Sequence, residues 1–156
     1  MIFLMSGLTD QPTEQQLKEL RQPSLGRLLL KANRVFSSKA LALLKQKGYS
    51  NLNLAHTALL PHLDQQGNRL TVLTERMGLT KQSISQLVAE LESQGYLERI
   101  PDPTDRRAVL VRFTASGWEL CQLSSQVVQD TEKAFEQMLG QSDLTLLKGI
   151  LEKLQE

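Results

Sequence analysis

TVLTERMGLTKQSISQLVAELE, residues Thr71–Glu92, is the stretch that decides the fold. It predicts two short helices joined at Gly78, because glycine adopts a positive φ at no steric cost. We expect Thr71 to cap the first helix and Thr80 to cap the second. The apolar residues of the second helix share one face and can pack against the first: Ile84, Leu87, Val88 and Leu91 against Val72, Leu73 and Met77. The pattern is that of a helix-turn-helix.

The opposite face of the second predicted helix is polar and carries no acid in its first two turns: Lys81, Gln82, Ser83, Ser85 and Gln86. A helix fits the major groove of DNA, where glutamine can pair with adenine and lysine with guanine. The helix N-terminus and the Thr80 hydroxyl suit a phosphate oxygen. A plain helical hairpin with a solvated polar face fits this motif equally well, so the motif alone does not decide between them.

A β-hairpin follows this unit. Residues 95–100 and 108–113 alternate like strands, and the polar segment 101–107 between them reads as the hairpin tip. Arg106 and Arg107, which we place at the tip, suit a narrow minor groove, where negative potential is concentrated. We expect Asp105 to brace an arginine through a charge-assisted hydrogen bond. A solvent-exposed turn explains the hairpin by itself, but the two elements in this order indicate a DNA-binding lobe.

The flanking segments read as helices. One begins at the N-cap Ser24 and ends at Gly48, and a shorter one spans about 53–65 with a bend or break at Pro61. After the hairpin, a long helix leads from Ser116 to Leu139, and Ser142-Asp143 is expected to cap a last helix that runs through Leu154.

The predicted fold class is therefore mainly α with a small β-wing, a winged helix-turn-helix lobe plus a helical dimerisation region. We expect one structural domain overall with four parts: an N-terminal arm (1–23), a helical dimerisation and support region (24–68), the winged lobe (69–115) and C-terminal dimerisation helices (116–156).

The net charge of +1 hides a segregated chain. Arg21–Leu63 holds seven basic residues and no acid, while Thr114–Glu156 holds three basic and seven acidic residues. One face can therefore meet phosphates while another stays acidic. No apolar run reaches the ~18 residues that cross a bilayer, and the single Cys121 cannot form an internal disulfide. We expect a cytoplasmic protein without a membrane partner.

The span from Arg69 to Gly117 resembles the MarR family of bacterial transcription regulators. The resemblance rests on Leu70-Thr-x-Leu73-x-Glu75-Arg76-x-Gly78-Leu79-Thr80-Lys81-Gln82, Leu87-Val88-x-x-Leu91-Glu92, Gly95-Tyr96-Leu97-x-Arg99, and Asp102-Pro103-x-Asp105-Arg106-Arg107-Ala108 leading to Phe113-Thr114-x-x-Gly117. It implies a triangular homodimer whose terminal helices intertwine. Its partner would be double-stranded DNA with a palindromic operator, half-sites lying roughly one helical turn (~10 bp) apart, and repression would be the output.

The resemblance also implies a small lipophilic or phenolic effector, bound where the dimer helices meet the winged lobe. The candidate residues are Phe36, His56, Leu59, His62 and Trp118, although ordinary packing explains each of them too. His56 and His62 are six residues apart and cannot form the i, i+4 zinc pair of a helical metal site, so we expect neither metal nor other cofactor. Cys121 allows a redox role, but a structural thiol is the simpler interpretation.

Catalytic signatures are missing from the sequence, which has no glycine-rich phosphate loop and no nucleophile elbow. We therefore do not expect an enzyme. The alternative that stays open is a protein–protein interaction module on a winged-helix scaffold without sequence-specific DNA binding.

Overall fold

A computed structural model describes residues 13–154 of the chain. The chain divides into two compact units, residues 1–35 and 36–156, and helix α2 (Leu25–Gln46) passes from one to the other. Of the N-terminal arm predicted for 1–23, residues 1–12 lie outside the described residues, and the short helix α1 (Glu14–Leu20) occupies much of the rest.

The first unit contains α1 and the beginning of α2. The Ser24 hydroxyl accepts a hydrogen bond from the Arg27 N–H at 3.4 Å, as expected of an N-cap. Several large apolar side chains of this part of α2 are exposed to solvent: Leu25, Leu28, Leu30 and Val35.

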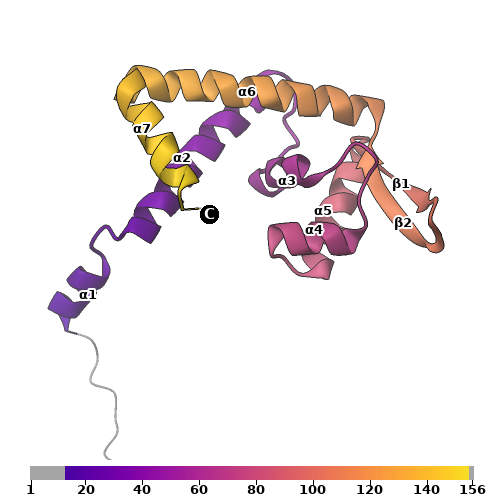
Figure 1. Ribbon diagram of the computed structural model, residues 1–156, viewed down its shortest axis with the longest axis horizontal. Coiled ribbons are helices and arrows are strands. Elements are labelled where there is room, and N and C mark those ends of the chain that lie inside the picture. Colours follow the sequence, from indigo (N-terminus) through magenta and orange to yellow (C-terminus); the bar gives the residue numbers. More distant parts are fainter. Residues whose placement is uncertain (1–12, 155–156) are drawn as a thin grey trace, which may run out of the picture. The chain divides into compact units, whose positions relative to one another are not determined.

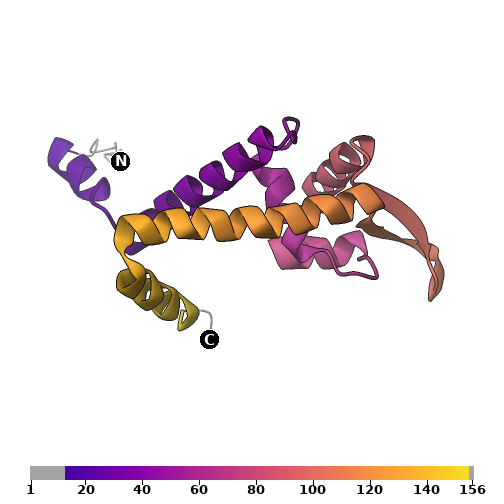
Figure 2. The same cartoon turned by 90° about the horizontal axis from the view of Figure 1, so that it is seen from above.

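The second unit holds the remaining elements in the order shown in Figure 1. They are α3 (Leu54–Leu59), the 3₁₀ turn η1 (Leu60–His62), α4 (Leu70–Met77), α5 (Lys81–Ser93), β1 (Leu97–Asp102), β2 (Asp105–Phe113), α6 (Ala115–Leu139) and α7 (Gln141–Glu152). The predicted fold class, mainly helical with a small two-stranded wing, is confirmed. In Figures 1 and 2, α3, α4 and α5 cluster beside the wing at one end of α6, and α7 lies at the other end.

The core of the lobe follows the predicted helical faces. Ile84, Val88 and Leu91 of α5 are fully buried together with Leu73 of α4, and Met77 and Leu87 pack at the edge of the same cluster. Fully burying a leucine, isoleucine or valine contributes about 1.5–3 kcal/mol. The two helices are therefore held as one body.

Two predicted helix caps are wrong. Thr71 lies inside α4, and the N-cap position belongs to Arg69, whose side chain makes no capping hydrogen bond. Ser142 and Asp143 lie in the first turn of α7, which begins after Gly140. Gly140 adopts φ +86°, a conformation that ends α6. Helix α7 then begins directly at Gln141, before the position at which Ser142 could act as its N-cap.

The break expected at Pro61 is confirmed. Helix α3 ends at Leu59, and the chain continues as η1 with Pro61 in its first turn, where a missing N–H costs no helical hydrogen bond. Asn53 caps α3 and forms a reciprocal capping box with His56.

The wing is joined to α6 through a close contact at Gly117. The Thr114 hydroxyl donates to the Gly95 carbonyl at 2.6 Å, and Thr114 N–H donates to the Tyr96 carbonyl at 3.1 Å. Gly117 lies so close to this junction that an added Cβ would clash with the Tyr96 carbonyl oxygen and lie 3.1 Å from the Phe113 ring. A residue without a side chain is therefore required where the wing meets α6.

We predict that Gly117→Ala destabilises the chain by about 1–3 kcal/mol or more, because the methyl group forces apart the wing and α6. Urea denaturation followed by circular dichroism measures the change. Gly149→Ala is the matched control: Gly149 is also helical, no atom lies within 4 Å of its added Cβ, and this variant should be equally or more stable than the wild type. Equal midpoints for the two variants would contradict the close-packing argument.

Candidate nucleic-acid interface

The turn before α5 sets the direction of that helix. Gly78 adopts the left-handed conformation, with φ +63°, and terminates α4. The Thr80 hydroxyl then accepts from the Ser83 N–H at 3.2 Å and lies 2.8 Å from the Ser83 hydroxyl. Thr80 therefore caps α5 as predicted.

The polar face of α5 is open to solvent. Lys81, Gln82, Ser83 and Gln86 are exposed and Ser85 is half-buried, while Ile84 and Val88 on the other side are buried. The first turn contains no acidic residue. The five polar residues proposed from the sequence are thus brought together on one helical face.

The second turn of this face is connected to α3. Gln86 Nε2 donates to Glu90 Oε1 at 3.0 Å, and Glu90 Oε2 lies 2.7 Å from Nε2 of the buried His56. The hydrogen bonds from His56 and Gln86 hold the pKa of the Glu90 carboxyl below its usual value. Glu90 therefore stays a carboxylate that links α3 to the exposed face of α5.

The wing differs from the prediction at its tip. The turn consists of Pro103 and Thr104 alone, and Arg106 and Arg107 belong to strand β2 rather than to the tip. Between the register pairs Pro101–Val109 and Asp102–Asp105, β2 holds residues 106–108 while β1 holds none. The two arginines therefore lie in a bulge, a feature that bends a strand and redirects its side chains.

The turn is tight because Asp102 closes it. One oxygen of the Asp102 carboxylate accepts from the Thr104 N–H at 2.8 Å and from the Thr104 hydroxyl at 2.6 Å. The other accepts from Arg69 Nε at 2.7 Å and lies 2.6 Å from Arg69 Nη2. These contacts, with the Thr104 hydroxyl and N–H first, lower the pKa of Asp102 to about 2.

Asp105 and Arg107 lie next to the contacts that Asp102 makes with Thr104 and Arg69. The Asp105 carboxylate accepts from the Arg107 N–H at 3.0 Å and lies 3.8 Å from Arg69 Nη2. Arg107 is exposed. Arg69, which immediately precedes α4, and Asp102, only 5% exposed, were not among the predicted site residues. The sequence did carry a signal for Asp102, which stands two residues before Thr104 and three before Asp105. This spacing is typical of turns that an aspartate side chain closes.

A second brace fixes the chain ahead of α4. Arg76 forms a two-pronged ion pair with Asp64, at 2.9 and 2.8 Å, and donates to the His62 carbonyl at 2.7 Å. Asn68 bonds Asp64 through its side chain and pairs with Val111 of β2 through both backbone groups, at 2.9 and 2.8 Å. The loop before α4 thus acts as a third, one-residue partner of the wing.

The five effector candidates lie in different surroundings. Phe36 contacts Phe135 with a ring separation of 5.5 Å, and Trp118 contacts Phe113 at 4.9 Å. Leu59 is fully buried, His56 is engaged by Asn53 and Glu90, and His62 is half-buried. An effector role for these residues stays a prediction.

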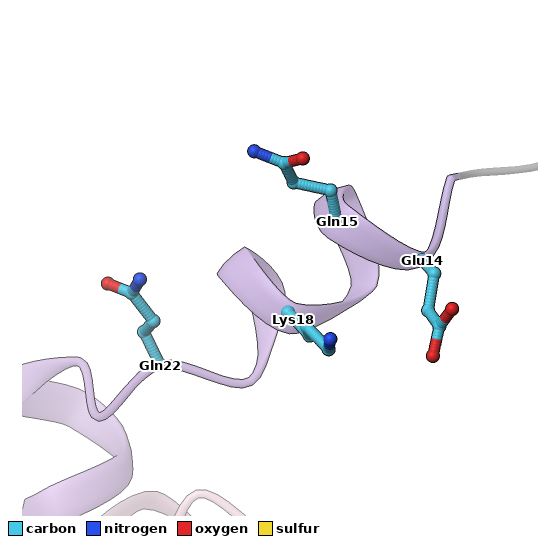
Figure 3. A pocket seen from close by; sticks show the side chains of 4 residues that line it. All are labelled: Glu14, Gln15, Lys18 and Gln22. Atoms are coloured by element: carbon cyan, nitrogen blue, oxygen red, sulfur yellow. The ribbon is translucent and has the colours of Figure 1, made fainter.

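Among the described residues, surface hollows lie elsewhere. Figure 3 shows the side chains that line a hollow of about 490 Å³ at α1 and the loop after it, with Glu14 and Lys18 on one side of the helix and Gln15 and Gln22 on the other. A hollow of about 250 Å³ between α2 and α6 is lined by Lys39, Ala42, Leu43, Thr131 and Ala134. The second is mostly apolar with one cation at its margin.

Cys121 is half-buried at the edge of the core, and burial raises the pKa of its thiol. Within residues 13–154 no three His, Cys, Asp or Glu side chains gather where they could hold a metal ion. In the same part of the chain, none of the helices combines the length and apolar character needed to span a bilayer.

The two-helix unit with an exposed polar face, followed by a braced two-stranded wing, defines a winged helix-turn-helix fold. Residues 50–108 match the model of the MarR family. The resemblance to the MarR family found in the sequence is confirmed over this segment.

Relatives and solved structures agree with this assignment. The chain is 30% identical over 73 residues to the multiple antibiotic resistance protein MarR of Escherichia coli (strain K12), an alignment covering 46% of this chain and 51% of the relative. It thus spans about half the length of this curated relative.

Two solved structures share the fold. A mutant of E. coli MarR complexed with operator DNA has a TM-score of 0.69 at 24% identity, covering 83% of this chain and 92% of that one. The transcriptional repressor CouR, bound to a 23-mer DNA duplex, has a TM-score of 0.72 at 21% identity, covering 90% of this chain and 97% of that one. At these identities the likeness establishes the fold.

We predict that Asp102→Asn lowers the stability of the chain at neutral pH and that this deficit narrows in acid. The folded-state pKa of Asp102, about 2, lies below the ordinary value of 3.8 for an aspartate, so the stabilising effect of the carboxylate is complete above 3.8 and is lost as the pH falls toward 2. Urea midpoints of the two proteins between pH 7 and pH 3 measure the convergence. Asp130→Asn, which removes a surface ion pair on α6, is the control and should change little at any pH. A deficit independent of pH would refute the role of the carboxylate charge.

Proposed function

We propose that this chain is a DNA-binding transcription regulator that acts as a homodimer in the cytoplasm and represses a promoter by occupying a palindromic operator. The observation that carries the proposal is the acid-free, solvent-exposed front of α5, held in one lobe with the bulge that contains Arg106 and Arg107. DNA binding, rather than catalysis, is the activity that this arrangement supports.

The proposed contacts divide into two kinds. The N-terminus of α5, with Thr80 and Ser83, suits a phosphate oxygen, and such contacts set the register of a protein on the duplex. Lys81, Gln82, Ser85 and Gln86 would face base edges in the major groove, where sequence is read.

The wing would engage the neighbouring minor groove through Arg106 and Arg107. Both residues lie in the bulge of β2, and the Asp105 carboxylate accepts from the Arg107 backbone N–H and lies 3.8 Å from Arg69 Nη2. The acid beside the arginines is therefore partly neutralised, which favours approach to a phosphate backbone.

Dimerisation is supported by the apolar surface of the terminal helices. The last two helices and the turn after α7 expose large apolar side chains to solvent: Met138, Leu139, Leu146, Leu147, Ile150 and Leu154. Several exposed apolar side chains on neighbouring helices support an interaction site. A second copy related by two-fold symmetry would cover it and would place two reading helices on half-sites roughly one turn, ~10 bp, apart.

Release by a small lipophilic or phenolic effector is the regulatory part of the proposal. Such a ligand must bind the DNA-bound and free conformations unequally. The five residues predicted from the sequence lie in different surroundings, whereas the apolar hollow beside Lys39 offers a cation for an anionic ligand. A protein–protein interaction module is the alternative, and the two are separated by salt dependence, since only DNA binding releases condensed counterions.

We predict that binding to duplex DNA weakens steeply with salt and that Arg107→Ala reduces the slope of log Kobs against log salt concentration by about 1. The exposed guanidinium would account for roughly one phosphate-type contact. Fluorescence anisotropy with a labelled duplex from the chain's own promoter region measures the slope. Lys133→Ala, which removes an exposed cation from α6, is the control and should leave it unchanged. Salt-insensitive binding by the wild type would favour the interaction module.

We predict that Gln82→Ala loses about 1–3 kcal/mol of preference for the operator over arbitrary duplex, because a side chain that reads a base edge contributes to specific binding alone. Competition binding against operator and random duplexes measures the ratio. Affinity for the random duplex should stay within error of the wild type. A uniform loss on both duplexes would assign Gln82 to the backbone rather than to a base.

A further inference from the structure

Among the proposed base-reading side chains, Gln86 is bonded to an acid: its Nε2 donates to Glu90 Oε1 at 3.0 Å. An ionised carboxylate accepts hydrogen bonds and cannot donate them. The amide must therefore turn its nitrogen toward Glu90, and its carbonyl oxygen is left to face away from Glu90.

Glu90 is itself held in place from α3. Its Oε2 lies 2.7 Å from His56 Nε2, and His56 is 2% exposed. The Asn53 N–H donates to His56 Nδ1 at 3.3 Å, so Nδ1 is the acceptor and the ring proton resides on Nε2, where it can be donated to Glu90. The Asn53 amide nitrogen lies farther from Nε2, at 3.4 Å. The capping box of α3 thus determines the tautomer that fixes Glu90.

We propose that Glu90, anchored by His56, is a positioning residue that fixes the polarity of the Gln86 amide, so that Gln86 reads a base bearing an exocyclic amino group. This inference rests on the proposed function. In the major groove, adenine N6 and cytosine N4 are donors, whereas guanine offers only the acceptors O6 and N7 and thymine the acceptor O4. A Gln86 carbonyl oxygen pairs with the first two. Adenine fits best, since the second amide hydrogen can reach its N7.

The same arrangement weakens general affinity. Glu90 is the first acid along α5, and a carboxylate near the duplex is repelled by phosphates whatever the sequence. One oxygen of the Glu90 carboxylate accepts from His56 and the other from Gln86. Through the second contact the carboxylate would help to select a base, while its negative charge opposes the binding of any duplex. Removing the charge should therefore separate selectivity from affinity.

The test uses the full chain and a pool of random duplexes to find the sequence that it selects, followed by competition binding with single-base variants. With Gln86→Ala, preference should fall by roughly 5-fold or more at one position, occupied by adenine or cytosine in the selected sequence. With Glu90→Gln, an amide replaces the carboxylate, and either orientation of Gln86 becomes acceptable. Preference at that same position should fall, while affinity for random duplex stays equal or rises.

Two further variants sharpen the test. Glu92→Gln removes the same charge from the same helix, but Glu92 pairs with Arg99 on β1 at 3.1 Å, so base preference should be unchanged. The double variant Gln86→Ala with Glu90→Gln should lose no more preference than Gln86→Ala alone, because the two residues act through one contact.

The outcomes separate the inference from the proposed function. A wild type that selects no sequence refutes the proposed function and the inference with it. A wild type that selects a sequence, with full preference kept in Glu90→Gln or a guanine or thymine at the Gln86 position, overturns the inference alone. Equal weakening of Glu90→Gln on all duplexes also overturns it, since that is the effect of a structural contact between α3 and α5.

Discussion

The Asp102 carboxylate is the group on which the geometry of the lobe depends. It closes the wing turn through Thr104, and its other oxygen holds Arg69, the N-cap residue of α4. The Asp102 carboxylate therefore connects the tip of the hairpin to the start of α4, although Asp102 and Arg69 are 33 residues apart in the sequence. Because α4 packs on α5, the placement of the wing is transmitted to the polar front of α5.

The same design recurs at the other elements of the proposed interface. Asp64 ties Arg76 of α4 to the loop that pairs with β2, and Glu90 ties α5 to the buried His56. In each case an exposed or half-exposed side chain is held by a polar partner from a different element. Binding surfaces that are fixed before contact lose less conformational entropy on association. The polar bonds of this lobe thus position its surface in addition to any stability that they contribute.

Local signals in the sequence were sufficient for the helices, the turn at Gly78 and the cap at Thr80, because each depends on residues within four positions of one another. They failed where a distant partner decides. Thr71 is the better capping residue by type, yet the chain enters α4 at Arg69, whose side chain is held by Asp102. The wing turn was expected to be seven residues long, and the bonds from Thr104 to Asp102 shorten it, which moves Arg106 and Arg107 into a strand. The proposed reading face of α5 was accessible from periodicity alone, but its link to His56 joins positions 34 apart and has no local signature.

An acid on a helix that is proposed to approach DNA requires a physical reason. Glu90 is half-exposed and lies one turn beyond Gln86, where a free carboxylate would oppose phosphates. Both oxygens of Glu90 are instead bonded to donors of the protein, His56 and Gln86. These bonds keep the pKa of Glu90 low, so the carboxylate stays negatively charged. A neutral residue at this position would bind DNA at least as tightly but would leave the Gln86 amide free to rotate. The proposed role of the Glu90 carboxylate is therefore to orient the Gln86 amide, which favours one base over another and does not raise the affinity for DNA in general.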